Sequence, residues 1–538
     1  MCHVFLRGVR RAAYARQGGG MADSQDPGHL FIVQGDLTQV AVDAAIVPCD
    51  ADQNFHRGFA AFFGESTRGG SFCEREYVRP LEQHVIGVED SIGLWAYRKG
   101  DGGSAGSTHV FLLETSNEHG GLNSLLDRMK RAIRHISSVA EASAPGKRPS
   151  IALTLPGVHA GGFRDRYAAA ARGTLECLAA LAGEAGGPDL VMVLARRADY
   201  AALQYLRRQL QSQVPCARNP EWAPAFDIAR QLAEFAAHDS LTLFIGAGAS
   251  AGSGLPDWQG LLLGATNDPE LRRAIKERRI EMVDVAAIIE QEELPEDFKN
   301  LVAHSLDSSL YSLTQAMLTS LRIPEAITTN FDRSYESAHS EVAVFPRAGK
   351  TWSRPWLLKL HGDVERPDTM VLTREDYVRL EMNSAPTASI LQSRMMTSHV
   401  LFVGYSVSDE NVIRLARQVQ QFRLAHGTGG VEPIGTVLGP RFDKLKARLW
   451  SDVLRFVELP DNEDGGRNVL VFLDHLAMHA SSDIGFLLND KYGALLTPDD
   501  LAIKESLGAL LKARRAVTPS DSIRDAVDNF LGQLGKSV

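Results

Sequence analysis

The segment Leu241–Trp258, LTLFIGAGASAGSGLPDW, limits the fold of this chain more than any other stretch. Its apolar first part has the composition of a buried β-strand and leads directly into a run rich in glycine. Glycines let the backbone turn tightly and bring amide N–H groups against a phosphate. The segment therefore predicts a strand followed by a pyrophosphate-binding turn. A glycine-rich turn without a ligand is the alternative.

The residues after this turn argue against a dehydrogenase. A hydride-transferring Rossmann enzyme needs a second strand that ends in an acidic residue about 20 positions further on, which binds a ribose. Here Asp268 and Glu270 lie in the sequence NDPELRR, where carboxylates are expected at the start of a helix. The pattern from Asp268 to Leu321 is helical, so we expect a helical insert instead of that strand.

Three later apolar runs also end in polar clusters, at Thr328–Asp332, His361–Asp363 and Gly404–Ser406. The carboxyl ends of parallel strands meet at one edge of a sheet, where ligands bind in open α/β folds. Each cluster alone has a simpler explanation as a turn or as a half-buried histidine. Together with the glycine-rich turn, the clusters favour a dinucleotide site at that edge.

The 538 residues are enough for about two to four domains. Short apolar runs alternate with helical patterns along much of the chain, which predicts α/β folds with parallel sheets. We expect a disordered extension over 1–29, an α/β domain over 30–203, a proline-containing linker over 204–225, a second α/β domain over 226–460 and a helical C-terminal region over 461–538.

Composition argues against several classes of protein. The 57 Lys and Arg residues against 66 Asp and Glu give a net charge of −9, and no long basic block occurs, so a nucleic-acid partner is not indicated. Five cysteines without pair spacing fit a reducing compartment rather than a disulfide framework. No apolar run approaches the ~18 residues of a membrane span. We therefore expect a cytoplasmic protein with no membrane segment.

The polar clusters occur in an order that resembles the motifs of sirtuins. GAGAS at 246–250 with GLPDW at 254–258, then TNFD at 329–332, then KLHG at 359–362 are similar to the NAD-binding and catalytic motifs of that family. The resemblance covers about residues 239–459. It implies a Rossmann-like, parallel-sheet domain that carries the helical insert.

Two further motifs, LTREDY at 372–377 and GYSVSDEN at 404–411, make the chain more similar to the sirtuin-like branch of bacterial antiphage-defence proteins, which includes the Thoeris effector. That branch is known chiefly for hydrolysing NAD. Protein-deacetylating sirtuins carry a structural zinc on two cysteine pairs, whereas no cysteine follows Cys216 here, so the four-cysteine module cannot be built. The resemblance thus implies NAD as the substrate, and no metal is expected.

The resemblance also assigns roles to individual residues. It implies that Asn330 binds the nicotinamide ribose or the attacking water and that His361 is the general base, so these two are the expected catalytic residues. Asp257 has an alternative role as a helix cap. Asp409 is interpreted as the start of a helix and is not included. The NAD-binding residues that we expect are Gly246, Ala247, Gly248, Ser250, Asp257, Asp332, Gly404, Tyr405 and Ser406.

The N-terminal α/β region resembles a macro domain in two places. FIVQGDLTQVAVDAAIVPCDAD at 31–52 is similar to the opening of that fold, and LTLPGVHAGGF at 153–163 is similar to its phosphate loop. Pro48, Cys49 and Asp50 replace the usual Ala-Asn pair, which argues against removal of ADP-ribose from proteins. We expect this domain to sense an ADP-ribose-like or cyclic nucleotide activator. A structural role in oligomerisation or docking is the alternative.

Together these features predict an NAD hydrolase that yields nicotinamide and ADP-ribose or its cyclic form, and that acts as an antiphage immune effector by depleting NAD. A homo-oligomer is expected. Two alternatives stay open: an NAD-dependent protein deacylase or ADP-ribosyltransferase, and a non-catalytic sensor that binds NAD or ADP-ribose. The presence of both Asn330 and His361 argues against the second alternative.

Overall fold

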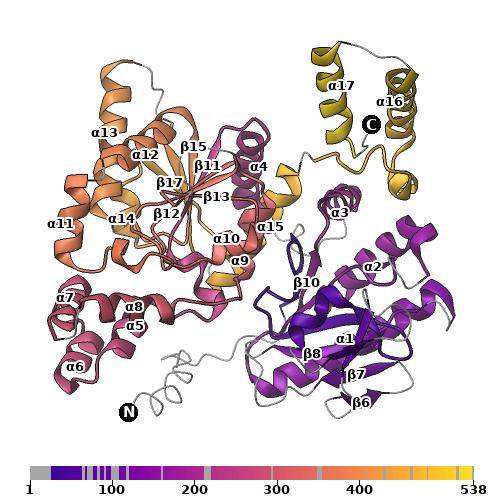
Figure 1. Ribbon diagram of the computed structural model, residues 1–538, viewed down its shortest axis with the longest axis horizontal. Coiled ribbons are helices and arrows are strands. Elements are labelled where there is room, and N and C mark those ends of the chain that lie inside the picture. Colours follow the sequence, from indigo (N-terminus) through magenta and orange to yellow (C-terminus); the bar gives the residue numbers. More distant parts are fainter. Residues whose placement is uncertain are drawn as a thin grey trace. The chain divides into compact units, whose positions relative to one another are not determined.

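The chain divides into two compact units, each described here by itself (Figure 1). Of the described residues, unit 1 contains His238–Leu470, and unit 2 contains those up to Ala237 together with those from Val471 on. Most of the expected N-terminal extension, residues 1–25, lies outside the described residues. The computed structural model describes residues 26–63, 67–69, 77–80, 85–89, 93–97, 108–116, 120–158, 162–210, 220–292, 295–347, 354–383, 385–407, 409–427, 432–460, 464–481, 483–516 and 520–535.

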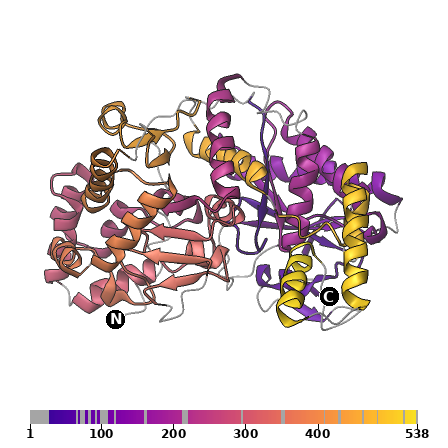
Figure 2. The ribbon, with the colours of Figure 1, turned by 90° about the horizontal axis from the view of Figure 1, so that it is seen from above.

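Unit 1 is built on a seven-stranded sheet whose strands all pair in parallel (Figure 2). The strands are short and largely buried, as expected for a parallel sheet covered by helices. In β11, the strand that the glycine-rich segment predicts, all residues are buried. The strands are β11 (Leu241–Ile245), β12 (Glu325–Thr328), β13 (Ala343–Phe345), β14 (Trp356–Lys359), β15 (His399–Val403), β16 (Gly435–Leu438) and β17 (Leu454–Phe456).

The order of these strands creates a switch point between β11 and β15. The sheet reads β13-β14-β12-β11-β15-β16-β17. From β11 the chain first adds β12 and later β14 on one side, and β15 then returns to the other side of β11. Ligands bind at such reversals in open α/β sheets, outside the carboxyl ends of the strands. The glycine-rich turn follows β11 and the Gly404 cluster follows β15, so both lie at this point.

The helical insert forms a small core of its own. Leu262, Ile275, Ile289 and Phe298 pack together, and Leu372 from the LTREDY segment packs with them. Lys299 reinforces this packing because its Nζ lies 3.0 Å from an Asp376 carboxylate oxygen. The helices of the insert are α6 (Pro269–Glu277), α7 (Met282–Glu292), α8 (Pro295–Ser305) and α9 (Leu313–Ser320), and α5 (Trp258–Ala265) precedes it. The other helices of unit 1 are α10 (Ser334–Ala338), α11 (Arg374–Asn383), α12 (Ala385–Thr397), α13 (Glu410–Ala425) and α14 (Lys444–Leu449).

Unit 2 contains a second seven-stranded sheet, in the order β1-β10-β9-β2-β8-β7-β6. The first five of these strands pair in parallel, and β7 and β6 run antiparallel at one edge. A separate three-stranded sheet has the order β3-β5-β4. The strands are β1 (Leu30–Gln34), β2 (Ala44–Cys49), β3 (Phe55–His56), β4 (Thr67–Gly69), β5 (Tyr77–Pro80), β6 (Val85–Glu89), β7 (Leu94–Tyr97), β8 (His109–Glu114), β9 (Ser150–Leu153) and β10 (Asp189–Leu194).

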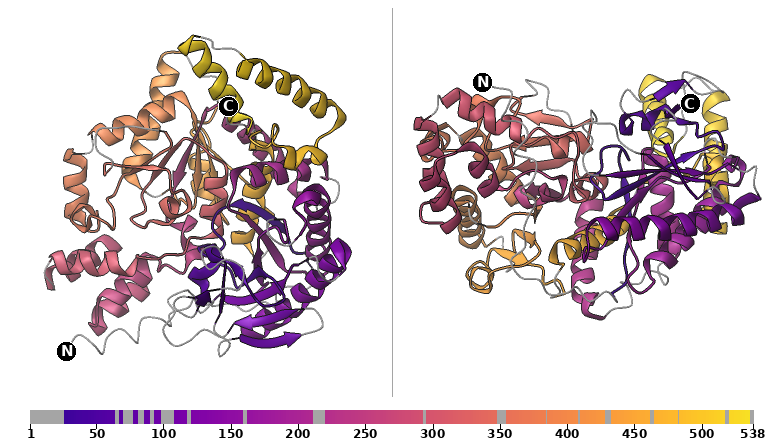
Figure 3. Two further views of the ribbon diagram at one scale, coloured as in Figure 1. Left: turned by 45° about the vertical axis from the view of Figure 1, so that its right-hand side comes forward. Right: turned by 90° about the horizontal axis from the view of Figure 1, so that it is seen from below.

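From Val471 on, the helical C-terminal region is part of unit 2. Phe486 and Tyr492 share a hydrophobic core with Tyr167 and Leu203, which come from the first half of the unit. α16 and α17 lie side by side (Figure 3). The helices of unit 2 are α1 (Gly121–Ser143), α2 (Tyr167–Ala182), α3 (Arg197–Gln209), α4 (Ala223–Ala237), α15 (Gly465–Ala480, from Val471 on), α16 (Pro498–Ala516) and α17 (Asp521–Gln533).

The segment expected to be a linker, 204–225, contains regular structure where it is described. Helix α3 continues to Gln209, and α4 begins at Ala223. Both helices belong to unit 2, so the division between the units falls after Ala237. The expected linker is therefore helical at both described ends, and its middle, residues 211–219, lies outside the described residues.

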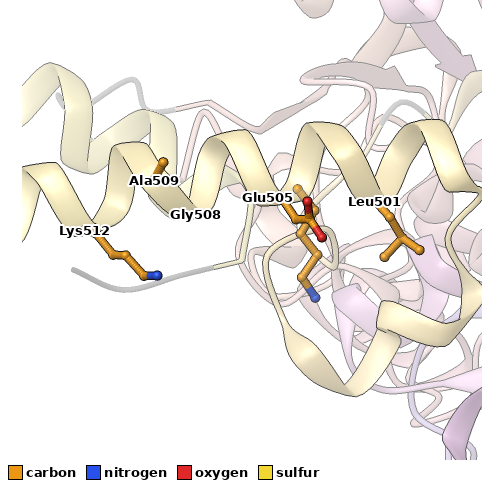
Figure 4. Close-up of a pocket in the computed structure, with 6 residues that line it drawn as sticks. Leu501, Glu505, Gly508, Ala509 and Lys512 are labelled. Atoms are coloured by element: carbon orange, nitrogen blue, oxygen red, sulfur yellow. The ribbon is translucent and has the colours of Figure 1, made fainter.

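Two surface properties of the described residues complete the fold. A pocket of about 430 Å³ lies on α16 and is lined by Leu501, Lys504, Glu505, Gly508, Ala509 and Lys512 (Figure 4). All six residues belong to one helix, and none of the expected site residues is among them. Within the described ranges, no helix is both long and apolar enough to cross a membrane.

A buried ion pair joins the C-terminal helix α15 to the first half of unit 2. Asp474 is fully buried, with Arg207 Nη1 at 2.8 Å from one carboxylate oxygen and His29 Nε2 at 2.7 Å from the other. Burial by itself raises the pKa of Asp474, but Arg207 and then His29 outweigh it and hold that pKa well below its usual value. The carboxylate is therefore charged and paired inside the core, where an unpaired charge is costly.

We expect Asp474→Ala to lower the free energy of unfolding of unit 2 by roughly 3–5 kcal/mol, because it leaves Arg207 buried without its partner. Since the folded-state pKa of Asp474 is lowered, this contribution is present at neutral pH and is lost as the pH falls below about 4. Urea unfolding at pH 7 measures the effect. Asp227→Ala, which removes an exposed partner of Arg230 in the same unit, is the control and should change stability by less than about 1 kcal/mol. Equal effects of the two substitutions would contradict the assignment.

Candidate active site

The turn after β11 and the corner after β15 are in direct backbone contact. Gly246 N donates to Val403 O at 2.9 Å, and Gly248 N donates to Gly404 O at 3.0 Å. A Cβ atom on Gly404 would lie 2.3 Å from Ala249 N, and Gly404 has a φ of +65°. A Cβ on Gly246 would lie 2.5 Å from Gly404 O. Glycine is therefore required on both sides of this contact, which brings two of the predicted clusters together.

The turn itself consists of two short 3₁₀ segments, Ala247–Ala249 and Ala251–Ser253. Several of its amides already have partners, because Gly246 N and Gly248 N bond to the β15 side and Ser250 N donates to Ala247 O at 3.1 Å. Ala247 and Gly248 are exposed, whereas Ser250 is buried. The part of the turn that can meet a phosphate is thus narrower than the sequence predicts, and it centres on the exposed Ala247.

Asn330 is attached to the glycine-rich turn. Its Nδ2 donates to Gly246 O at 3.1 Å and to Ser250 Oγ at 3.3 Å. Thr328, at the end of β12, shapes the approach, because its Oγ1 accepts from Asn330 N at 3.0 Å and donates to Ile245 O at 2.8 Å. The predicted catalytic amide is therefore held in place by the turn expected to bind the pyrophosphate.

His361 follows β14, the strand next to β12, and it is paired with a carboxylate. Its Nε2 lies 3.0 Å from Asp409 Oδ2, and its ring meets Tyr377 edge-on with the ring centres 5.5 Å apart. Asp409 is also the N-cap of α13 and accepts from the backbone N–H groups of Asn411 and Val412. Burial raises the pKa of Asp409, but these hydrogen bonds, led by that from His361, outweigh it and lower that pKa below its usual value. Asp409 is therefore ionised at neutral pH.

Asp409 is the residue that sequence reasoning left out. Its position before a helical pattern correctly indicates an N-cap, and that role gives no sign of a second partner. The pairing with His361 arises because the loops after β14 and β15 approach each other across the carboxyl edge of the sheet. His361 is thereby linked to the same loop as Gly404.

Lys359, the last residue of β14, contacts both the loop that carries Asn330 and the loop that carries His361. Its side chain is buried, and its Nζ donates to Phe331 O at 3.1 Å and to Asp332 O at 2.9 Å. The same atom lies 2.6 Å from Glu336 Oε1 and 3.2 Å from Asp363 Oδ1. One ammonium group thus meets two backbone carbonyls behind Asn330 and a carboxylate two residues beyond His361.

Four of the predicted binding residues have structural partners or positions of their own. Asp332 Oδ1 accepts from Ser334 N at 2.8 Å at the start of α10. Asp257 caps α5 by accepting from Gly260 N at 2.7 Å. The Tyr405 ring is buried, with its centre 4.9 Å from that of Phe244. Ser406 is exposed. The structure therefore gathers Gly246, Gly248, Ser250, Asn330 and Gly404 by direct contacts and connects His361 through Asp409.

The described residues contain no cluster of three or more His, Cys, Asp or Glu side chains that could hold a metal ion.

In unit 2, Gly157 and Gly162 of the predicted phosphate loop have φ values of +72° and +83°. Residues 159–161 of that loop, including Gly161, lie outside the described residues. The macro-like character of residues 30–203 stays a prediction.

Comparison with known family models finds a match within unit 1. Residues 324–450 match the family model described as a SIR2-like domain. This stretch contains Asn330, His361, Gly404 and Asp409, and the glycine-rich turn precedes it. The resemblance to sirtuins inferred from the motifs is thereby confirmed at the level of a SIR2-like domain over these residues.

Several curated proteins also match part of the chain. The chain is 29% identical over 184 residues to "NAD(+) hydrolase ThsA" of Cytobacillus dafuensis, covering 32% of this chain and 37% of that protein. It is 26% identical over 195 residues to "NAD(+) hydrolase ThsA" of Enterococcus faecium, covering 33% and 39%. It is 22% identical over 214 residues to "Defense-associated sirtuin 2" of Bacillus subtilis, covering 36% and 20%. The chain thus spans about two fifths of the length of the two hydrolases.

We expect Gly404→Ala to unfold or strongly destabilise unit 1, because the new Cβ would collide with Ala249 N in the neighbouring turn. Gly427→Ala is a matched control, since Gly427 has a similar φ of +61° but nothing within 4 Å of the added atom. The control should cost only the backbone strain, about 1 kcal/mol. Thermal unfolding of both variants measures the difference. Similar melting temperatures would show that the contact between the two loops is not tight.

Proposed function

We propose that the protein hydrolyses NAD to nicotinamide and ADP-ribose, linear or cyclic, and that it is an antiphage effector that depletes NAD when activated. The main support for this proposal is the way in which Asn330 and His361 are connected to the glycine-rich turn at the switch point of the sheet. Asn330 is bonded to the glycine-rich turn, and His361 is bonded to Asp409 from the loop that contacts the same turn. The relatives named NAD(+) hydrolase ThsA support this activity.

The reaction needs positioning and electrostatic stabilisation more than covalent catalysis. The bond between C1′ of the ribose and the nicotinamide nitrogen breaks, and its electron pair neutralises the positive charge of the pyridinium ring. The ribose then resembles an oxocarbenium ion. For the linear product, water adds to C1′ while it loses a proton to a base; for the cyclic product, an adenine nitrogen of the same molecule bonds to C1′ and no water is consumed. The protein must hold the ribose, admit one water molecule and accept that proton.

The proposed base is His361. Its Nε2 faces the ionised Asp409 and donates to it, so Nδ1 carries the lone pair that can take a proton from water. The imidazolium that forms is stabilised by Asp409, in the way that a buried aspartate supports histidine in other hydrolases. Asn330 is proposed to bind the ribose or the water through its side-chain oxygen, since its Nδ2 is already bonded within the protein.

The binding role of the remaining residues is part of the same proposal. The exposed backbone at Ala247 is proposed to meet the pyrophosphate, next to Gly248, whose own N–H is bonded to Gly404 O. Gly246, Ser250 and Gly404 shape that surface through their mutual contacts. Asp257, Asp332 and Tyr405 act in this proposal through the loops that they hold, because their side chains have partners or packing within the protein.

Incubation of the full-length protein with NAD, with and without an acylated peptide, tests the activity. We expect nicotinamide release without peptide, and we expect Asn330→Ala and His361→Ala each to lower it by at least ~100-fold. His426→Ala, an exposed histidine at the far end of α13, is the control and should keep the wild-type rate. Turnover that requires the peptide would overturn the hydrolase proposal in favour of a deacylase or an ADP-ribosyltransferase.

We expect Asp409→Asn to lower kcat by about 10–100-fold with little change in KM, because it removes the charge that orients and stabilises His361. Asp443→Asn is a matched control, since Asp443 also caps a helix, α14, by accepting from two backbone N–H groups, but it lies in a different loop. Steady-state kinetics of both variants separate the two roles of Asp409. If both substitutions lower kcat equally, Asp409 acts only as a cap.

A further inference from the structure

Asn330, which is proposed to bind the ribose or the water, belongs to a buried polar trio with Ser250 and Gln315, and Gln315 has no role so far. Gln315 is on α9, and its exposed fraction is 1%, compared with 4% for Ser250 and 8% for Asn330. Gln315 Nε2 donates to Ser250 Oγ at 3.0 Å, and Asn330 Nδ2 donates to the same oxygen at 3.3 Å. Two amides from different elements thus converge on one hydroxyl group.

The position of Gln315 is itself fixed by the glycine-rich turn. Ser312, the N-cap of α9, accepts from Gln315 N at 3.1 Å and donates to Ala249 O at 2.5 Å. Thr319 Oγ1 donates to Gln315 O at 3.1 Å one turn later. The side chain of Gln315 therefore reaches Ser250 from a helix that is anchored to the same turn.

Among the residues that the structure describes, the hydroxyl proton of Ser250 is left without a partner by the two hydrogen bonds that its oxygen accepts. A serine oxygen has two lone pairs and one proton, and here both lone pairs accept amide N–H groups. The hydroxyl proton is then the only remaining hydrogen-bonding group of Ser250, and within the described residues no acceptor is found for it. Asn330 Oδ1 and Gln315 Oε1 are also buried without a hydrogen-bond partner in the described part of the chain.

The free proton of Ser250 and the free oxygen of Asn330 are adjacent, because Asn330 Nδ2 contacts Ser250 Oγ. A donor beside an acceptor complements a sugar hydroxyl, which both accepts and donates. A phosphate oxygen only accepts, so it would leave Asn330 Oδ1 buried without a partner. The pair therefore fits a ribose hydroxyl better than it fits the pyrophosphate.

We propose that Gln315 is a positioning residue that, by donating to Ser250 Oγ, directs the serine proton and the Asn330 side-chain oxygen toward a hydroxyl of the NAD ribose. This inference rests on the proposed function and specifies how that site recognises its substrate. Gln315 acts through Ser250, since its own side chain is buried behind that residue. The donor character of its amide, rather than its size, is what the site requires.

Gln315→Glu reverses the direction of this hydrogen bond with almost no change in shape. A carboxylate only accepts, so the Ser250 proton turns toward residue 315 and is lost to the ligand. Once protonated, the glutamic acid can donate again. Burial raises the pKa of such a group and brings this change into the range of ordinary assays. The variant should therefore recover as the pH falls, which a residue that merely fills space would not do.

The neighbours of Gln315 do not interfere with this readout. Its hydrogen-bond partners Ser250, Ser312 and Thr319 carry no group that titrates between pH 5 and 9. α9 packs against α10 and the 3₁₀ segment Ala251–Ser253. On α10 the titratable groups are Tyr335, whose pKa burial raises, and Glu336, which is ion-paired with Lys359.

The experiment measures kcat/KM for NAD and the dissociation constant of ADP-ribose from pH 5 to 8.5 with the full-length protein, each expressed relative to wild type at the same pH. For Gln315→Glu we expect at least a ~10-fold loss in both at pH 8 and recovery to within about 3-fold at pH 5. Gln315→Met, which cannot donate at any pH, should show the loss throughout and keeps the test valid if the charged variant does not fold. Gln420→Glu is the control, because Gln420 is also buried but donates to Asp452 O and not to Ser250 or Asn330.

The role of Gln315 is overturned if the kcat/KM and affinity of Gln315→Glu, relative to wild type, do not change with pH. It is also overturned if Gln315→Met has the same kcat/KM and affinity as the wild type. The wild type could bind ADP-ribose, with the variants showing the expected changes in affinity, and yet release no nicotinamide from NAD. In that case the role of Gln315 in ribose recognition stands and the hydrolase proposal fails. A wild type that neither binds ADP-ribose nor cleaves NAD overturns both proposals.

Discussion

The contact between Gly404 and the turn Gly246–Ala249 is the constraint on which the site depends. Two neighbouring parallel strands, β11 and β15, end at this contact, and the backbone leaves no room for a Cβ atom on either side. Because the two loops are held so close, Asn330 can bond to the turn while Asp409, from the loop that begins at Gly404, reaches His361. Four strand ends are thereby combined into one surface at the reversal of the strand order.

Buried charge makes this arrangement rigid. Lys359 is surrounded by two backbone carbonyls from the Asn330 loop and by the carboxylates of Glu336 and Asp363. Moving the loops that carry Asn330 and His361 apart would separate Lys359 from partners in both loops, which is costly for a buried charge. The rigidity suits a reaction in which the main task of the protein is to position a ribose and a water molecule before the bond breaks.

Unit 2 also contains a buried ion pair, which joins its C-terminal helices to its N-terminal part. Asp474 brings helix α15 onto the first half of the unit by pairing with Arg207 and His29. The helices that follow then complete the hydrophobic core of the N-terminal sheet, so the first and last parts of the chain form one folding unit. The C-terminal helices thus have a stabilising role in this unit that does not depend on any ligand.

Local patterns in the sequence determined the strands of unit 1, the helical insert, the glycine-rich turn and the polar residues at the strand ends. These features depend on residues close together in the chain, through β-propensity, helical periodicity and the conformational freedom of glycine. Only the tertiary structure decided that Asp409 pairs with His361, that Gln315 supports Ser250, and that the C-terminal helices complete the N-terminal unit. Those contacts join residues far apart in the sequence. They depend on the order of strands in the sheet and on which helix crosses it, and a helix cap or a buried glutamine has the same local pattern whether or not such a partner is present.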